Sequence, residues 1–271
     1  AHGQEVKGGR LGGGGPFHIE HQGCGGHAPA AEGHQLGTQF AAGDAKAFAA
    51  ALTAPGRAAT ARVAQPVLLT EEQATATRIR QELEGMASRV QPADVFVLYL
   101  AGHGVSNDQG EYVFLPQDLL YQNSTSLRSG LVGPELRRLL AQIKSTKTGV
   151  VLDTCSSGAF RLAGRSMGEK GAIDRLARLA GRVVRAAAGA QQRALESPDN
   201  QRGIYTGALL RALNGQADTN RDGLVGIGEV ADFVDGEVQR ITLSLFGYLQ
   251  TPMREMSGQT FPLTRRGAGA P

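Results

Sequence analysis

VFVLYLAGHG, residues 95–104, and VVLDTCSSG, residues 150–158, decide the fold of this chain. Each begins with an unbroken run of apolar, largely β-branched and aromatic residues, which is typical of a strand buried on both faces of a parallel sheet. Each run leads into small residues around one reactive side chain, His103 in the first stretch and Cys155 in the second. Because reactive groups gather at the carboxyl ends of parallel strands, we expect both side chains at one edge of a sheet, each three residues past its strand.

Strand and helix patterns alternate around these two stretches. Thr70 and Gln73 have the spacing of a capping box at a helix start, and Pro66 would direct its strand toward a sheet edge. Helices are predicted over 44–52, 70–91, 134–143, 206–213 and 230–241, and strands over 63–69, 95–100, 111–115 and 149–152. The alternation predicts an α/β domain with a mostly parallel sheet flanked by helices.

Composition narrows the function classes. The 271 residues include 28 basic and 25 acidic ones, and the net charge of +3 is too small to indicate nucleic-acid binding. Two cysteines exclude a disulfide framework, and no apolar run approaches the roughly 20 residues of a membrane span. We therefore expect a soluble, cytoplasmic protein with neither a nucleic-acid nor a membrane partner. The chain starts at Ala1 rather than Met, so additional domains upstream are compatible with it.

Residues 1–37 differ from the rest, with 12 of the 38 glycines and five of the six histidines. They lack helical or strand periodicity, which predicts a disordered N-terminal segment. Two alternatives stay open. The first is a zinc site, because four residues of zinc-ligand type recur at every third position. The second is out-of-frame translation, because GC-rich DNA in the wrong frame yields a similar composition. The zinc-ligand types are His18, His21, Cys24 and His27.

At its two decisive stretches the chain resembles the caspase-like cysteine peptidases, in particular their bacterial metacaspase-like, or orthocaspase-type, branch. FAAGDAKAF (40–48), VVRAAAGAQQRALE (183–196) and GIYTGALLRAL (203–213) extend the likeness. It implies a caspase-like domain over 38–263 and a C-terminal tail over 264–271. Within the domain it implies a large-subunit-like segment (38–160), a connector (161–182) and a small-subunit-like segment (183–263). The family's domain begins with a buried strand, for which residues 1–37 offer no apolar run.

The resemblance also implies a mechanism. Cys155 would be the nucleophile of an endopeptidase and His103 its general base, because a thiol with a pKa near ~8.5 needs help to ionise. The backbone N–H groups of Gly104 and Cys155 would hold the oxyanion. The chemistry would require no cofactor. The rival hypothesis is a catalytically silent interaction module on the same fold, regulated by calcium.

In metacaspase-like enzymes two aspartates line the primary pocket, and they match Asp44 and Asp153 here. Two carboxylates attract a cation, so the resemblance implies protein or peptide substrates with Arg or Lys at the cleavage site. Asp44 alone has a second interpretation, as an acidic residue that faces the dipole of its own helix.

The connector is strongly basic. Residues 161–185 hold seven basic and two acidic residues, which suggests that the enzyme cuts itself there after Arg or Lys. The alternative for 174–185 is a solvated basic helix.

Residues 218–229 read DTNRDGLVGIGE and match the calcium-binding loop of EF-hands at positions 1, 3, 5, 6 and 12. The candidate ligands are Asp218, Asn220, Asp222, the Leu224 carbonyl and Glu229. An Asx-type turn between two helices would use the same residues without a metal, so calcium binding stays one of two interpretations.

Overall fold

The computed structural model describes residues 40–60, 62–107, 111–119, 129–154, 181–186, 196–197 and 202–267. The predictions for residues 1–37 and for most of the connector lie outside these ranges. The helical elements are α1 (Ala41–Thr53), η1 (Glu71–Gln73), α2 (Ala76–Arg89), α3 (Gly133–Gln142), α5 (Ile204–Arg211), the π-helical η4 (Ala212–Gln216) and α6 (Ile227–Phe246).

A six-stranded sheet forms the centre of the fold, in the order β3-β2-β1-β4-β5-β9. Its strands are β1 (Val95–Ser106), β2 (Tyr112–Leu115), β3 (Leu131–Val132), β4 (Lys147–Thr154), β5 (Gly181–Ala186) and β9 (Met253–Ser257). Strands β1, β4 and β5 are parallel neighbours, whereas β2 and β9 run antiparallel to theirs. The sheet is therefore mixed, with the predicted parallel strands at its core.

Two short pairs complete the described strands. Strand β8 (Leu224–Gly226) pairs with β10 (Pro262–Arg265), and β6 (Glu196–Ser197) pairs with β7 (Arg202–Gly203).

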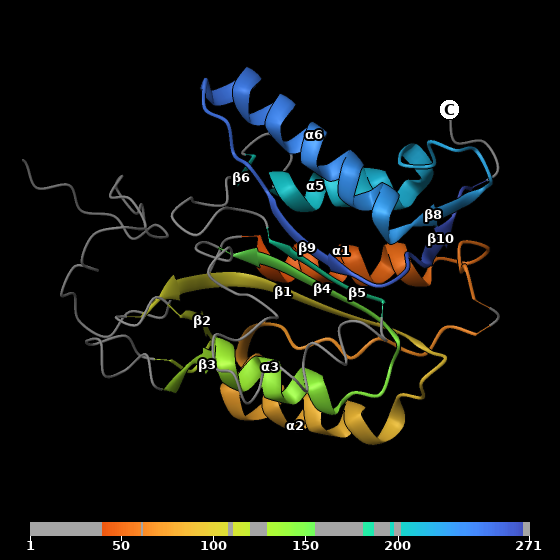
Figure 1. Ribbon diagram of the computed structural model, residues 1–271. Coiled ribbons are helices and arrows are strands. Elements are labelled where there is room, and N and C mark those ends of the chain that lie inside the picture. Colours follow the sequence, from red (N-terminus) through yellow and green to blue (C-terminus); the bar gives the residue numbers. More distant parts are fainter. Residues whose placement is uncertain are drawn as a thin grey trace, which may run out of the picture.

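Helices cover both faces of the sheet (Figure 1): α2 and α3 lie on one face, and α1, α5 and α6 on the other. Each face has its own apolar cluster. The α2/α3 cluster includes Leu83, Leu139 and Leu152, and the α1/α5/α6 cluster includes Phe48 and Val234. A sheet buried on both faces requires strands that are apolar throughout.

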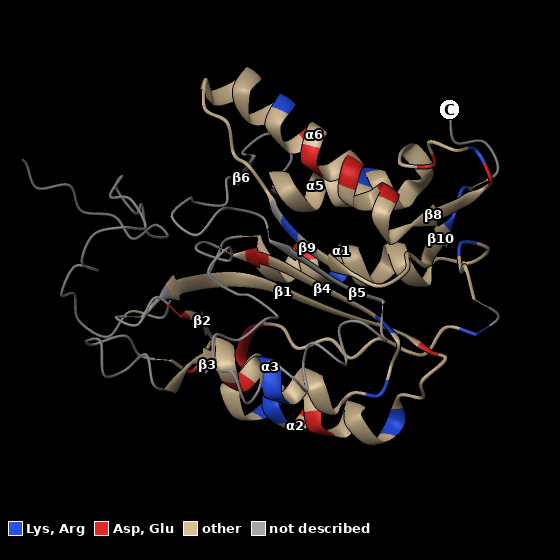
Figure 2. Ribbon diagram, in the orientation of Figure 1, with Lys and Arg blue, Asp and Glu red and all other residues tan. Residues whose placement is uncertain are grey.

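The central strands meet that requirement. Charged residues gather on the helices and connections, while β1 carries none (Figure 2). In β4 the charges are confined to Lys147 at the start and Asp153 near the end. Val150 and Leu152 pack on the α2/α3 side and Val151 on the other, as the alternation of a strand dictates. The α/β class predicted from sequence is thus confirmed.

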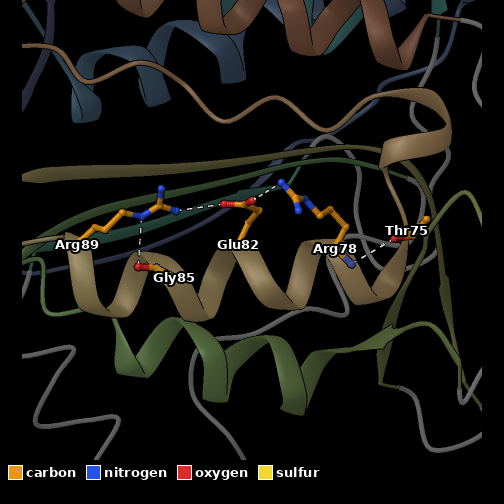
Figure 3. Close-up of polar contacts among 5 residues, drawn as sticks. All are labelled: Thr75, Arg78, Glu82, Gly85 and Arg89. Atoms are coloured by element: carbon orange, nitrogen blue, oxygen red, sulfur yellow. Dashed lines mark hydrogen bonds and ion pairs between the residues drawn. The ribbon is translucent and has the colours of Figure 1, made fainter.

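Helix α2 begins later than predicted. Thr70 precedes the short η1, and the helix proper starts after Thr75, whose Oγ1 accepts the N–H of Arg78 at 3.2 Å. On the outer face Glu82 pairs with Arg78 at 2.9 Å and with Arg89 at 3.1 Å (Figure 3). These exposed pairs contribute little stability, and the helix is held mainly by its buried apolar face.

Three predictions of elements were wrong. Residues 63–69 form no strand: Val63, Val67 and Leu68 are 45%, 40% and 39% exposed, and Pro66 has no N–H to donate to a ladder. Residues 181–185 belong to strand β5 rather than to a basic helix. Strand β1 continues to Ser106, six residues beyond its predicted end.

No helix among the described residues is long and apolar enough to cross a membrane.

Candidate active site

The parallel pairing of β1 with β4 ends one residue before each of the two predicted catalytic positions. The two strands are paired in parallel from Val95 with Lys147 to Gly102 with Thr154. His103 is the residue after Gly102, and Cys155 is the residue after Thr154. Cys155 itself lies outside the described residues.

The sequence predicted that His103 lies beyond the end of its strand, but the residue lies inside β1. Strand β1 instead changes partner: up to Gly102 it pairs with β4, and from His103 to Ser106 it pairs with β2. His103 is opposite Leu115, and the buried Gly104 is opposite Phe114. The histidine is therefore positioned by two ladders, one on each side of the change.

Gly102 makes this change of partner sterically feasible. Its φ is +147°, a conformation that residues with a side chain rarely adopt, and an added Cβ would lie 3.3 Å from Phe114 Cε2. Nearby, the hydroxyls of Tyr112 and Thr154 are 3.0 Å apart, and both residues are fully buried. This contact ties the end of β4 to β2, immediately before Cys155.

The predicted specificity residues Asp44 and Asp153 converge in space. Asp44 comes from α1 and is 4% exposed, and Asp153 comes from the end of β4 and is 9% exposed. A Cβ placed on Gly203 would lie 3.0 Å from Asp44 Oδ2 and 3.1 Å from Asp153 Oδ2. The Gly203 N–H donates to Asp44 Oδ2 at 2.9 Å. We call Asp44 and Asp153 the acidic pair.

Asp153 is anchored by two residues that the sequence did not indicate. Thr206 Oγ1, on α5, donates to Asp153 Oδ2 at 2.5 Å, and the Tyr99 hydroxyl lies 2.5 Å from Thr206 Oγ1. Because the threonine's single proton goes to Asp153, the Tyr99 hydroxyl is the donor of this group, toward Thr206 Oγ1 and, at 3.4 Å, toward Asp153 Oδ2. Burial raises the pKa of Tyr99 well above its ordinary value, and the Asp153 charge raises it further, so the phenol keeps that proton. Tyr99 also stacks on Phe48 of α1, with ring centroids 4.7 Å apart.

A cation already approaches the acidic pair. Arg202, in β7, places Nη1 3.8 Å from Asp44 Oδ1, and its side chain is 33% exposed. Nη1 makes no hydrogen bond within the described part of the chain. The guanidinium thus compensates part of the negative charge of Asp44 without a close bond.

The two predicted metal sites lie in different parts of the chain, one near the N-terminus and one at residues 218–229. The four zinc-ligand types near the N-terminus lie outside the described residues. Within the described ranges, no group of three or more His, Cys, Asp or Glu side chains is arranged to hold a metal ion. In the loop 218–229 the carboxylates bond to nearby backbone N–H groups and to a hydroxyl.

A protein-family model, the caspase domain, matches residues 40–263. The chain belongs to the caspase family. The match contains His103, Cys155 and the acidic pair, and a caspase domain suggests a cysteine protease that acts on protein substrates.

Among solved structures, this caspase-family chain is similar to the crystal structure of protein GSU0716 from Geobacter sulfurreducens. The two share 18% sequence identity with a TM-score of 0.53, covering 83% of this chain and 87% of the other. At that identity the likeness supports the fold alone. A search of curated proteins finds no significant match.

Proposed function

We propose that this caspase-family chain is a cysteine endopeptidase of the bacterial metacaspase-like branch that cleaves after Arg or Lys. The observation that carries the proposal is the convergence of two buried carboxylates, Asp44 and Asp153, on the backbone of Gly203. Asp153 is two residues before Cys155, so a cation held by the acidic pair would place the next peptide bond near the thiol.

The strand register supports a Cys155/His103 dyad. Each residue directly follows one member of the paired positions Gly102 and Thr154 on adjacent parallel strands. Neighbouring strands lie about 4.8 Å apart, so residues that follow a paired position start within reach of each other.

The proposed chemistry follows from these two groups. His103 accepts the proton of the Cys155 thiol, and the thiolate attacks the carbonyl carbon of the Arg or Lys residue. The backbone N–H groups of Gly104 and Cys155 stabilise the oxyanion. His103 then protonates the leaving amine as the C–N bond breaks, which leaves a thioester. Water, deprotonated by His103, hydrolyses the thioester and releases the acid and the thiol.

Electrostatics favour a basic residue at the cleavage site. The two carboxylates are buried, and the guanidinium of Arg202 lies 3.8 Å from Asp44 rather than at close ion-pair distance. Attraction between charges is stronger there than at the surface, because burial lowers the effective dielectric constant. An acidic substrate residue would be repelled.

A cleavage profile on a peptide library tests the proposal. We expect cleavage after Arg and Lys, none after Asp, and complete loss of cleavage in Cys155→Ala and His103→Ala. Asp153→Asn should lower kcat/KM for Arg substrates by about 100-fold, the cost of removing one partner of a buried charge pair. Asp232→Asn, at an exposed site on α6, is the matched control. No cleavage and no labelling of Cys155 by an arginyl-ketone probe would instead indicate a silent interaction module.

Self-processing extends the same proposal. Five of the seven basic residues of 161–185 precede strand β5, and they offer cleavage sites between the two subunit-like segments. Incubation of wild type should produce fragments that end at Arg or Lys in this range, and Cys155→Ala should stay intact. Equal fragmentation of both would show that another protease cuts the connector.

A further inference from the structure

The loop at residues 218–229 joins two helical elements. The chain enters from α5 and η4, which ends at Gln216, and leaves through α6, which begins at Ile227 (Figure 1). Inside the loop, the fully buried Val225 of β8 pairs with Thr264 of β10. The loop is therefore held at three places by folded structure, and its conformation does not depend on its own residues alone.

The loop closes around the carboxylate of Asp218. The Gly223 N–H donates to Asp218 Oδ2 at 3.3 Å, across five positions of the chain. Gly223 has a φ of +81°, which turns the backbone back toward Asp218. Because one carboxylate oxygen is bound across the loop, the Asp218 side chain faces the inside of the loop.

The second oxygen of this carboxylate makes no hydrogen bond to any described residue. Asp218 is 6% exposed, and its Oδ1 is a buried atom without a partner. Burying an ionised carboxylate is costly unless its oxygens are paired or coordinate a metal. Hydrogen bonds within a simple turn would account for Oδ2, but they leave Oδ1 unexplained. This atom is what distinguishes the loop from an ordinary Asx-type turn.

Further oxygen donors surround the same loop. Asn220 Oδ1 accepts the Asp222 N–H at 2.9 Å, and Asp222 Oδ1 accepts the Leu224 N–H at 2.8 Å. Both residues are solvent-exposed, and these hydrogen bonds turn one oxygen of each side chain back onto the loop. The loop carries three carboxylates, on Asp218, Asp222 and Glu229, and one opposing cation on Arg221.

Glu229 presently has other partners. Its Oε2 accepts the Gly226 N–H at 2.9 Å and caps α6, and its Oε1 lies 3.3 Å from Thr219 Oγ1. The three carboxylates therefore do not converge in this arrangement. A metal ion bound through Glu229 would require this side chain to leave its cap, at the cost of one capping bond.

We propose that the loop 218–229 binds one Ca²⁺ ion. Its ligands are the side-chain oxygens of Asp218, Asn220, Asp222 and Glu229 and the backbone carbonyl of Leu224. Ca²⁺ fits better than Mg²⁺ because it accepts six to eight oxygens in flexible geometry, whereas Mg²⁺ requires a near-ideal octahedron. The ion supplies the missing partner of Asp218 Oδ1 and links the end of η4 to the start of α6.

Calorimetry with CaCl₂ on the full-length chain tests the site directly. The Cys155→Ala background prevents any self-cleavage and leaves the loop untouched. We expect one Ca²⁺ per chain, and at saturating Ca²⁺ a rise in Tm of about 5–10 °C, because a ligand that binds only the folded state stabilises it. Mg²⁺ at the same concentration should give a smaller shift.

Two variants in the loop locate the ion, and a third variant outside the loop serves as the control. Glu229→Gln keeps an oxygen to accept the Gly226 N–H, so α6 stays capped, and it should weaken Ca²⁺ binding by more than about 10-fold. Asp218→Asn should abolish binding. Glu84→Gln, at an exposed position of α2 on the opposite face of the sheet, should bind Ca²⁺ like the parent.

Absence of both binding heat and Tm shift in the parent overturns the site, as does unchanged affinity in Glu229→Gln. If Asp218→Asn fails to fold, the Glu229→Gln result decides alone. No step measures peptidase activity, so failure of this site and failure of the proposed peptidase function are seen separately.

Discussion

At the scale of single residues, Gly102 is the position where the site depends most on the absence of a side chain. Its φ of +147° and the 3.3 Å approach to Phe114 both disfavour alanine. We expect Gly102→Ala to lower the free energy of unfolding by about 1–3 kcal/mol, measured by chemical denaturation. Because His103 is the next residue, kcat should fall in the same variant.

Gly236, in the exposed middle of α6, is the matched control, since nothing lies within 4 Å of a Cβ there. Gly236→Ala should stabilise the protein by about 0.5–1 kcal/mol, because alanine loses less backbone entropy in a helix. If Gly102→Ala were neutral, the change of partner in β1 would not need glycine, and the account of how His103 is positioned would be wrong.

Arg202 competes with substrate for the acidic pair if the proposed specificity is correct. Its guanidinium lies 3.8 Å from Asp44 Oδ1 and is partly exposed, so it can be displaced. Arg202→Ala removes this internal cation, and KM for arginyl peptides should fall by about fivefold with kcat unchanged, the effect of a weak ion pair. Arg211→Ala, which breaks an ion pair with Glu237 instead, should leave KM unchanged. A raised KM in Arg202→Ala would mean that Arg202 helps to bind substrate.

The acidic pair shows how far residues could be predicted. Asp44 and Asp153 were identified from the family resemblance, and the structure brings them together. Tyr99 and Thr206 were missed, because each is an ordinary strand or helix residue in sequence. Their role arises from packing between β1 and α5, which are about a hundred residues apart in the chain, and no local pattern encodes such a contact.

At the scale of elements, an ion-pair cluster joins α5 to α6. Glu237 Oε1 lies 2.7 Å from Arg211 Nη2 of α5 and 2.7 Å from Arg240 Nη2 of α6. Hydrogen bonding from Arg240, with the charges of both arginines, holds the pKa of Glu237 below its ordinary value of 4.5. A carboxyl with a lowered pKa stabilises the fold above the unfolded-state pKa, and this contribution is lost as pH falls through the lower folded-state value.

Glu237→Gln should therefore lower Tm at neutral pH and have no effect in strong acid. We expect a difference of about 1–3 °C at pH 7, the effect of a partly exposed ion pair, shrinking below a pH of about 4.5. Thermal melts of wild type and variant across pH measure it, with Glu84→Gln as a control on α2. A difference that persists at the lowest pH would mean that packing, and not charge, links these helices.

Elements were predictable where burial is periodic and local. Sequence patterns reveal the apolar runs of β1 and β4 and the buried face of α3, because the core requires those patterns. The strand predicted over 63–69 failed because a strand needs a partner, and sequence alone does not show that the neighbouring ladder is absent. Residues 181–185 were interpreted as part of a basic helix because Arg182 and Arg185 flank the short β-branched run Val183-Val184. That run is too short to indicate by itself the parallel strand β5.

At the scale of the whole molecule, the two helical layers are coupled through the strands that they share. Adjacent residues of β4 belong to opposite clusters, with Val150 and Leu152 on the α2/α3 side and Val151 on the α1/α5/α6 side. Loss of either layer would expose one whole face of β1 and β4 to water, at a cost that grows with the apolar area exposed. We therefore expect the two layers to unfold together.

Leu139→Ala tests this coupling, because Leu139 is 1% exposed on α3 and belongs to the α2/α3 cluster alone. Removing a buried leucine side chain should cost about 2–4 kcal/mol. Hydrogen exchange should show the slowest amides of α3 and α6 losing protection by the same amount. Val234→Ala, on α6, should likewise lower the protection of the slowest amides in α3. Loss of protection confined to α2 and α3 would contradict a shared transition. It would show that the α1/α5/α6 layer, which carries Asp44 and the loop 218–229, is stable on its own.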